Sequence, residues 1–368
     1  MKKVLFVATV VQKHIKVFHI PFLQMFRQAG YETYVAAAND TDGAVSIPWC
    51  DRYVEIGFRR SPFHPANIGA FFRLRRLINS QHFDISHCHT PVGGVLGRLA
   101  SAKARRRGAK VIYTAHGFHF YRGAPFLNWL LFYPVEKLCA PLTDLLITIN
   151  RQDYELARRR LGAKRVEYVP GVGVDTDKFG KDASTKARIR AEKRRELGIP
   201  DDAKVILSVG ELNANKNHET AIRAVSDMDV YYLIAGEGGL YHRLRGLIDG
   251  LQLEKRVRLL GYRSDIAELH AAADMYLLPS YREGLNLSVM EAMASGLPIA
   301  CSRIRGNTDL IDPQGGVLFD PDSPQQCKAA IVQVLSGSPA GAGEYNRDKI
   351  ASFSKEKVCG IMKELYGL

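Results

Sequence analysis

The stretch that most constrains the fold of this chain is residues 274–302, which reads as a buried strand, a loop, a helix and a second strand. The apolar run from Met275 to Leu278 has the length and composition of a buried strand, and Pro279 ends it. Apolar residues then recur at helical spacing, at Leu287, Met290, Ala294 and Leu297. Gly296 ends that helix. In an open α/β sheet, the loop after the first strand lies at the edge where ligands bind.

The same alternation of strands and helices extends over nearly all of the 368 residues, a length that suits two domains. Strands are expected near 4–10, 31–38, 54–57, 84–89, 110–115 and 145–150 in the first half. In the second half they are expected near 204–210, 231–236, 257–261, 274–278, 297–301 and 316–319. The alternation predicts an α/β fold with two mostly parallel, doubly wound sheets. The Gly/Pro-rich segment from Val169 to Asp177 is a candidate hinge between them.

The excess of positive charge lies entirely in the first half of the chain. Residues 1–180 contain 26 Lys and Arg against 13 Asp and Glu, whereas residues 181–368 contain 25 of each. A one-sided basic domain indicates an acidic partner, which is anionic lipid, nucleic acid or a phosphate-bearing substrate. The segment from Arg59 to Arg76 also carries Phe63, Phe71 and Phe72. This composition is typical of an interfacial membrane patch and equally of a solvated helix face.

Cysteine usage and hydropathy favour a cytoplasmic protein. The six cysteines are scattered, and none forms a Cys-x-x-Cys pair, so neither a disulfide framework nor a zinc site is indicated. No apolar run reaches the roughly 18 residues that a membrane span needs. The triplet His87-Cys88-His89 alternates across a strand, with both histidines on one face. We interpret it as structural or as lining a cleft.

Two glutamates flank the helix start of the opening stretch, Glu283 in the loop and Glu291 about one turn into the helix. The backbone N–H groups near Leu285 to Ser288 carry a partial positive charge, which suits a phosphate or diphosphate. Carboxylates accept hydrogen bonds from vicinal hydroxyls, so the pair suits a sugar and a ribose. Two solvated glutamates beside an ordinary helix are the alternative interpretation.

The residues around these glutamates resemble the nucleotide-sugar signature of the family-4 retaining glycosyltransferases. The matching features are a strand ending in Pro-Ser, Glu283-Gly284, the run 291–298, Gly306-Asn307 and the run 309–311. The resemblance implies the GT-B fold of two facing Rossmann-like domains. It implies an acceptor-binding domain at 1–172, a nucleotide-sugar-binding domain at 173–345 and a C-terminal helix at 346–368 that packs back on the first domain.

The resemblance also implies three catalytic residues and a reaction. The donor is expected to be a UDP-sugar, transferred with retention of configuration by a hexosyltransferase that uses no metal and no other cofactor. Lys216 and the helix start would replace a divalent cation at the diphosphate. Glu283 would hold the transferred sugar and Glu291 the ribose. His116, in the pair His116-Gly117, would contact sugar hydroxyls and steady the developing positive charge.

Further donor contacts are expected from Gly210, Asn215, Tyr262, Arg263, Arg282, Gly284, Leu285, Asn286 and Leu287. By resemblance, Tyr262 and Arg263 would hold the nucleobase. Glu211 stands where the family has an arginine, and a carboxylate repels phosphate. Arg282 or Asn215 is therefore expected to supply the missing donor group.

The first βα turn departs from the family because Thr9 to His14 contains no glycine. It is not a Gly-x-Gly-x-x-Gly loop, so donor phosphate should bind through the second domain. We expect His14, Lys16 or His19 to face the acceptor instead, although each alone is more often plain surface. His119, in the run from His116 to Phe120, is expected to shape the acceptor pocket.

The run from His116 to Phe120 and the later Asn128-Trp129 resemble a subgroup of bacterial capsule and exopolysaccharide transferases. Together with the basic first domain, this favours a polyprenyl-diphosphate-linked saccharide as acceptor. The enzyme is expected to be cytoplasmic, peripheral at the anionic inner face of the plasma membrane, and to bind no nucleic acid. The sugar would be a hexose or N-acetylhexosamine.

Two alternatives remain open at this point. One is a GT-B-like UDP-sugar 2-epimerase or hydrolase, of which the epimerase would need different acids in the cleft and no acceptor. The other is a basic nucleic-acid- or membrane-binding module without catalysis, which does not explain the run 279–309.

Overall fold

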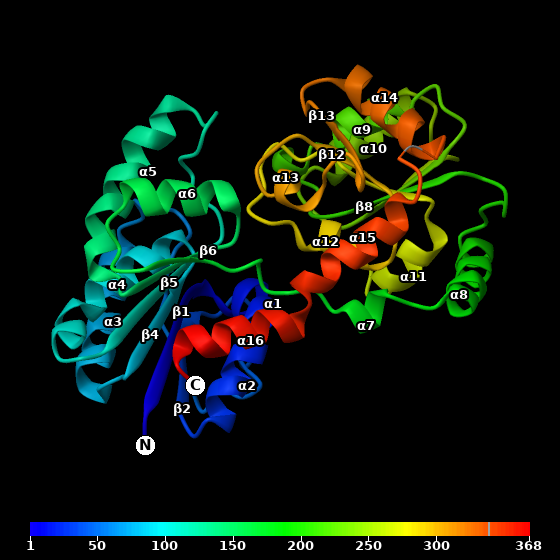
Figure 1. Ribbon diagram of the computed structural model, residues 1–368. Coiled ribbons are helices and arrows are strands. Elements are labelled where there is room, and N and C mark those ends of the chain that lie inside the picture. The colour runs from blue at the N-terminus through cyan, green and yellow to red at the C-terminus, as the bar shows by residue number, and fades with distance from the viewer. Residues whose placement is uncertain (338) are drawn as a thin grey trace. The chain divides into compact units, whose positions relative to one another are not determined.

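The computed structural model describes residues 1–337 and 339–368, and the chain divides into two compact units. The first unit contains Met1–Val172 together with Val358–Leu368, and the second contains Gly173–Lys357. Each unit holds one sheet with helices on both of its faces (Figure 1). The prediction of two doubly wound α/β sheets is therefore confirmed.

All neighbouring strands in both sheets run parallel. The first sheet has the order β3-β2-β1-β4-β5-β6-β7, with β1 Lys3–Val10, β2 Glu32–Ala38, β3 Arg52–Glu55, β4 Ile85–His89, β5 Lys110–Ala115, β6 Leu145–Thr148 and β7 Val166–Tyr168. The second has the order β10-β9-β8-β11-β12-β13, with β8 Val205–Val209, β9 Tyr231–Ala235, β10 Val257–Leu259, β11 Met275–Leu278, β12 Ile299–Ser302 and β13 Gly316–Phe319.

Helices connect these strands. The first unit has η1 Val11–Ile15, α1 Lys16–Phe18, α2 Ile20–Gln28, α3 Ala66–Gln81, α4 Pro91–Arg106, α5 Phe126–Cys139, η2 Ala140–Leu142 and α6 Arg151–Arg160. The second has α7 Thr176–Phe179, α8 Ala183–Glu196, η3 Ala214–Lys216, α9 His218–Ala224, α10 Tyr241–Gly250, α11 Ile266–Ala272, α12 Leu287–Ala294, α13 Asn307–Leu310, α14 Pro324–Leu335, α15 Ala342–Ile350 and η4 Ala351–Phe353. Helix α16, Lys355–Tyr366, starts in the second unit and ends in the first.

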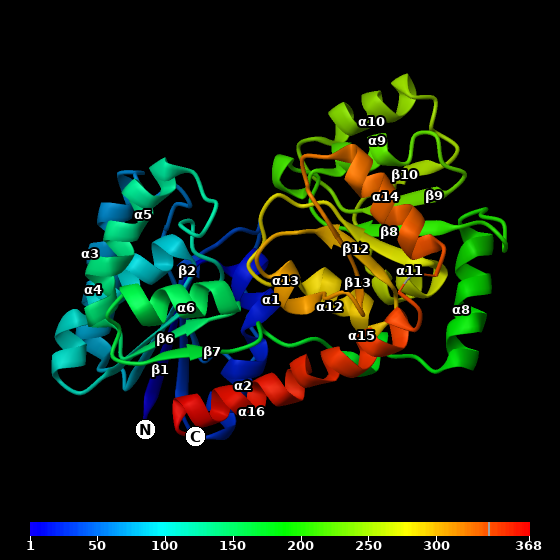
Figure 2. The same ribbon diagram turned by 45° about the horizontal axis from the view of Figure 1, so that its top comes forward.

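The first sheet has an apolar layer on each face, because successive side chains of a strand point to opposite sides. Leu5 and Val7 of β1 pack with α3, α4 and α5, whereas Val4 and Phe6 pack with α2 and α16. Helix α16 lies beside α2 in both views (Figures 1 and 2). Its Tyr366 ring lies 4.5 Å from the Phe26 ring, and its hydroxyl lies 2.8 Å from Nδ1 of buried His87. The end of the chain thereby completes the core of the first unit.

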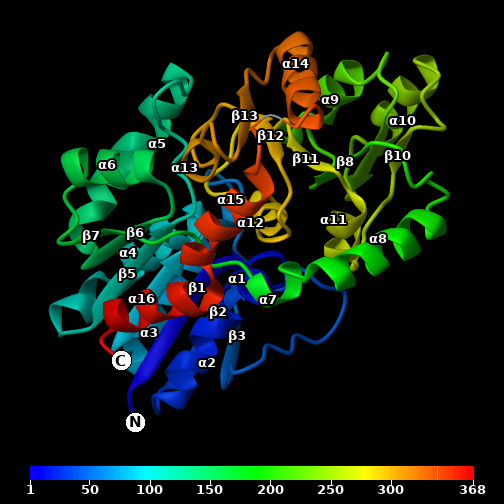
Figure 3. The ribbon, with the colours of Figure 1, turned by 45° about the vertical axis from the view of Figure 1, so that its right-hand side comes forward.

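The second sheet is covered in the same way, and the basic helix α8 lies beside α11 at its edge (Figure 3). The fully buried guanidinium of Arg194 fixes this helix. It donates to the carbonyl oxygens of Ala272 and Asp201 and pairs with the Asp274 carboxylate at 2.8 Å. A charge this deeply buried is stable only when paired and hydrogen-bonded, as it is here.

Two segments differ from the sequence prediction. The apolar spacing of residues 15–29 predicts one continuous helix, but this segment begins as the π-helix η1 and breaks at His19, because Pro21 has no N–H and sits in the first turn of α2. The tail returns to the first unit at Val358 and not at residue 346. Helix α15 stays in the second unit because the buried Asn346 amide donates to the carbonyls of Leu297 and Gly315, at 2.9 and 2.8 Å.

Replacing Tyr366 by Phe should destabilise the first unit, because it removes the hydroxyl that faces buried His87. The expected cost is about 1–2 kcal/mol, seen as a melting temperature lower by about 2–6 °C in calorimetry. Tyr262→Phe, at a side chain that is 76% exposed, is the control and should melt like the wild type. An unchanged melting temperature for Tyr366→Phe would show that the hydroxyl does not hold α16.

Candidate active site

Each sheet reverses its strand order at one place, between β1 and β4 in the first unit and between β8 and β11 in the second. Ligands of open parallel sheets bind beyond the carboxyl ends of the strands at such a point. The candidate residues gather at these two edges, one in each unit.

In the second unit, Lys216 and Glu283 form an ion pair. Lys216 ends η3 after β8, Glu283 lies in the loop after β11, and their Nζ and Oε1 atoms are 2.8 Å apart. Both side chains are largely shielded from solvent, with 17% and 14% of each exposed. The residues are 67 positions apart in the chain, and the parallel sheet brings them together. A cation and a carboxylate thus lie together at the carboxyl edge of this sheet.

Close packing around two glycines holds this arrangement, and at Gly306 it requires glycine. A Cβ on Gly210 would come within 3.0 Å of the Lys216 side chain, so the lysine lies directly over that glycine. A Cβ on Gly306, which has φ +79°, would stand 2.1 Å from the carbonyl oxygen of Gly284. Asn215 ties the two loops together, since its Nδ2 donates to Arg282 O and its own carbonyl accepts from Tyr281 N.

The start of α12 has an N-cap that sequence reasoning did not assign. The Asn286 side-chain oxygen accepts from Val289 N at 3.1 Å and from the Ser288 hydroxyl at 2.7 Å. We predicted Asn286 as a donor contact, and the structure commits its side-chain oxygen to the cap. The backbone N–H groups of Leu287 and Ser288, in the first turn, have no intrahelical acceptor, and such free N–H groups favour an anion.

Glu291 lies one turn further along α12 and is mostly buried. Burial raises the pKa of its carboxyl group from the ordinary 4.5 to about 7, against the opposing attraction of Lys178 and Lys355. A buried carboxylate loses hydration and so holds its proton more tightly. Near neutral pH this group is therefore poised between its acid and its ionised form.

The side chains of the other residues at the predicted sugar-donor site differ in solvent exposure and in ion pairing. Arg282 and Glu211 are exposed, and Tyr262 is 76% exposed. The Arg263 guanidinium is held by two carboxylates, Asp265 at 2.7 Å and Glu196 at 3.1 Å. This side chain joins its loop to α8, and its expected contact with the nucleobase stays a prediction.

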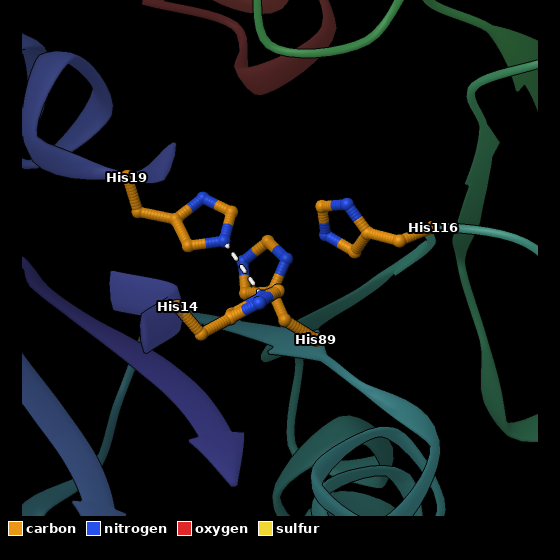
Figure 4. A group of neighbouring side chains, drawn as sticks. All are labelled: His14, His19, His89 and His116. Carbon is orange, nitrogen blue, oxygen red and sulfur yellow. Dashed lines mark hydrogen bonds between the residues drawn. The ribbon is translucent and has the colours of Figure 1, made fainter. Parts of the chain in front are cut away.

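In the first unit, four histidines converge at the switch point (Figure 4). They are His14 of η1, His19 before α2, His89 at the end of β4 and His116 directly after β5. The alternative that His14 and His19 are plain surface is wrong, because both side chains are buried. Burial lowers the pKa of His116 to about 4 and that of the other three well below 6.5. All four rings are therefore neutral at pH 7.

The strand triplet alternates across β4 as expected. Cys88 packs in the layer of α3 and α4, whereas the rings of His87 and His89 lie 4.0 Å apart on the other side. His87 is structural, since it bonds the Thr114 and Tyr366 hydroxyls at 2.8 Å each. Sequence reasoning missed that His89 joins His14, His19 and His116. The sequence did contain a signal for this cluster. His14, His89 and His116 stand at or just after the ends of the neighbouring strands β1, β4 and β5.

The glycine-free turn after β1 is closed to phosphate by a carboxylate. Asp40 accepts hydrogen bonds from the backbone N–H groups of Gln12 and Lys13, at 2.6 and 3.2 Å. These are the N–H groups that a phosphate-binding turn would offer to its ligand.

Two adjoining cavities lie beside the histidines in the first unit, and Arg60, Pro91 and Val92 line both. The smaller, of about 320 Å³, is also lined by Lys13 and His14. The larger, of about 350 Å³, is lined mostly by apolar and aromatic side chains, with His119 and Phe132 among them. The His119 and Phe132 rings are in contact, with their centroids 4.7 Å apart and their planes tilted by 32°. The smaller cavity is therefore basic, and the larger cavity is apolar.

Helix α5 carries an apolar surface that the sequence analysis did not single out. Six of its side chains are exposed by 38% or more, at Phe126, Leu127, Leu130, Leu131, Val135 and Leu138. Leu131 and Val135 also line the apolar cavity. Within the described residues, no helix has the length and hydropathy needed to cross a membrane.

The fold places the chain among GT-B proteins. It matches the structure of sucrose-phosphate synthase from Thermosynechococcus elongatus with a TM-score of 0.80, over 100% of this chain and 98% of that one, at 20% identity. It matches Anabaena Alr3699/HepE in complex with UDP and glucose with a TM-score of 0.79, over 100% of both chains, again at 20% identity.

Sequence relatives define the family. The model of Glycosyltransferase Family 4 matches residues 22–178, and that of Glycosyl transferases group 1 matches residues 189–350. The Bacillus subtilis (strain 168) protein EpsD, itself named a glycosyltransferase only provisionally, is 42% identical over 99% of this chain and 96% of its own. The Escherichia coli UDP-Gal:alpha-D-GlcNAc-diphosphoundecaprenol alpha-1,3-galactosyltransferase is 31% identical over 80% of this chain and 77% of its own. The chain belongs to the family-4 glycosyltransferases.

The raised pKa of Glu291 should make stability depend on pH. The folded state keeps this proton up to about pH 7, whereas an unfolded glutamate releases it near 4.5, so the native contribution is lost as pH rises between these values. Relative to Glu291→Gln, the wild type should lose about 3 kcal/mol from pH 4.5 to 7.5 and little more above that.

Urea unfolding at a series of pH values measures this difference. The exposed Glu364→Gln is the control and should follow the wild type throughout. A wild-type curve parallel to that of Glu291→Gln would contradict the burial of the carboxyl group.

Proposed function

We propose that the chain is a retaining, metal-independent hexosyltransferase that moves a hexose or N-acetylhexosamine from a UDP-sugar to a polyprenyl-diphosphate-linked saccharide. The observation that carries this proposal is the Lys216–Glu283 ion pair beside the first turn of α12. The nucleotide ligands named with the related Anabaena structures support a UDP donor. The lipid-linked acceptor in the name of the E. coli relative supports the acceptor class.

The ion pair suits a site whose substrate carries both an anionic diphosphate and sugar hydroxyls. Lys216 and Glu283 neutralise each other in a partly buried place where a lone charge would be costly. A UDP-sugar offers each of them a better partner, a diphosphate for the ammonium group and sugar hydroxyls for the carboxylate. The N–H groups of Leu287 and Ser288 would share the diphosphate charge, which is the task a metal ion performs elsewhere. Glu291, once ionised, would accept from the ribose hydroxyls.

The proposed reaction exchanges two bonds at the anomeric carbon of the sugar. The bond from this carbon to the diphosphate oxygen breaks, and UDP leaves with the electron pair. The acceptor hydroxyl forms the new bond from the same face, and its proton passes to the leaving diphosphate. His116 would contact the sugar hydroxyls and steady the positive charge that develops on the ring. Because burial keeps its imidazole neutral, it would do so by hydrogen bonding.

The two cavities of the first unit support a lipid-linked acceptor. Lys13 and Arg60 line the basic cavity and would neutralise the diphosphate of such an acceptor. The apolar cavity adjoins it, and a polyprenyl chain needs such a surface. The exposed apolar face of α5 and the arginines of α3 would bind the anionic inner face of the plasma membrane. His119 would shape the apolar cavity through its contact with Phe132.

Donor binding is expected to depend on Lys216 and not on metal. In calorimetry with a panel of UDP-sugars and excess chelator, one donor should bind, and Lys216→Met should weaken it about 10–100-fold, the worth of a charge-assisted hydrogen bond. Lys204→Met, at an exposed lysine before β8, is the control. Arg282→Ala tests whether Arg282 replaces the arginine missing at Glu211. Binding that needs a divalent ion, or that survives Lys216→Met, would contradict the proposal.

Membrane binding should depend on the arginines of α3. Reversing exposed Arg73, Arg75 and Arg76 to Glu should weaken flotation with phosphatidylglycerol vesicles at least tenfold, since each basic residue contributes about 1 kcal/mol. The control makes the same charge change at Lys181, Arg188 and Arg195, which are exposed in the second unit. Equal flotation of both triple variants would contradict the prediction that the arginines of α3 bind the membrane.

A further inference from the structure

The four histidines of the first unit have the geometry of a metal-ion site. One ring nitrogen from each of His14, His19, His89 and His116 lies within 4.8 Å of the corresponding atom of the other three. Figure 4 shows the rings turned toward a common point, although they come from different elements. Nitrogens around a tetrahedral zinc ion, with Zn–N near 2.0–2.1 Å, are about 3.3 Å apart. Each donor atom would therefore move inward by about 1 Å.

The hydrogen bonding of these rings is incomplete. Among the described residues, neither nitrogen of His89 has a partner, and nor do Nδ1 of His19 and Nε2 of His116. Such buried polar atoms are costly unless something satisfies them. The Nε2 atoms of His14 and His19 are 3.1 Å apart, which is close to the spacing of two ligands on one tetrahedral ion.

The donor set selects the kind of ion. All four ligands are imidazoles, and Cys88 points to the opposite face of the sheet. Neutral imidazole suits zinc and neighbouring divalent transition metals, whereas magnesium and calcium prefer oxygen ligands. The ring of His19 would have to leave its 3.8 Å contact with the His89 ring, and its position between α1 and α2, outside any long helix, allows that movement.

We propose that His14, His19, His89 and His116 bind one zinc ion in the first unit. The site has a consequence that rests on the proposed function. A zinc ion bound to the His116 ring would withhold it from the sugar, so occupancy would inhibit transfer. Zinc binding itself does not depend on what the enzyme transfers.

Cobalt(II) is the probe, because it occupies zinc sites and absorbs strongly in the visible range when it has four ligands. The untagged, chelator-treated full chain should bind one equivalent and show intense bands typical of tetrahedral cobalt, which an equivalent of zinc abolishes. His89→Gln should lose these bands. His218→Gln should keep them, since His218 is also buried with no partner for either nitrogen among the described residues, but lies in the second unit.

Absence of the bands in the wild type, or their persistence in His89→Gln, would overturn the proposal. If circular dichroism shows that His89→Gln does not fold, His14→Gln takes its place, because His14 is the most exposed of the three buried ligands. Calorimetry with UDP-sugars on the same samples reports the second unit separately. Loss of donor binding with cobalt binding intact would count against the proposed function and not against the metal site.

Discussion

The parallel direction of every strand in both sheets is the constraint on which the sites depend. It sends each loop that follows a strand to one edge of its sheet, so residues far apart in sequence meet there. Lys216 and Glu283 are joined in this way across 67 positions. The carboxyl ends of β1, β4 and β5 bring together His14, which follows β1, His89, which ends β4, and His116, which follows β5. The chemistry of each edge then follows from the side chains that the chain places just beyond its strands.

Burial sets the protonation of these groups, and it acts in opposite directions on acids and bases. It raises the pKa of Glu291 to about 7 and lowers that of His116 to about 4, so both groups favour their uncharged forms. In the second unit, the Lys216–Glu283 pair keeps two charges in place by letting each neutralise the other. In our proposal the donor diphosphate brings the negative charge that separates this pair. The first unit would contribute neutral rings, which suit sugar hydroxyls and zinc alike.

Much of the fold could be predicted from the sequence because buried strands and amphipathic helices have local signatures. The strand at Met275–Leu278 and the helix at Leu287–Ala294 follow from apolar spacing alone. The π-turn at Val11–Ile15 could not be predicted, since it depends on Asp40 accepting from the N–H groups of Gln12 and Lys13. The pairing of Arg263 with Asp265 and Glu196 could not be predicted either. A sequence does not show which charged side chains meet in the fold. The histidine cluster escaped notice because its members stand in four separate segments and each has an ordinary structural interpretation.

In our proposal, the Lys216–Glu283 pair holds the place of a nucleotide-sugar diphosphate. A crystal structure with a bound UDP-sugar would show whether the diphosphate binds there. We predict diphosphate oxygens within hydrogen-bonding distance of Lys216 Nζ and of the first-turn N–H groups of α12, with the Glu283 carboxylate turned to the sugar hydroxyls. A diphosphate bound elsewhere, with the ion pair still closed at 2.8 Å, would contradict the account.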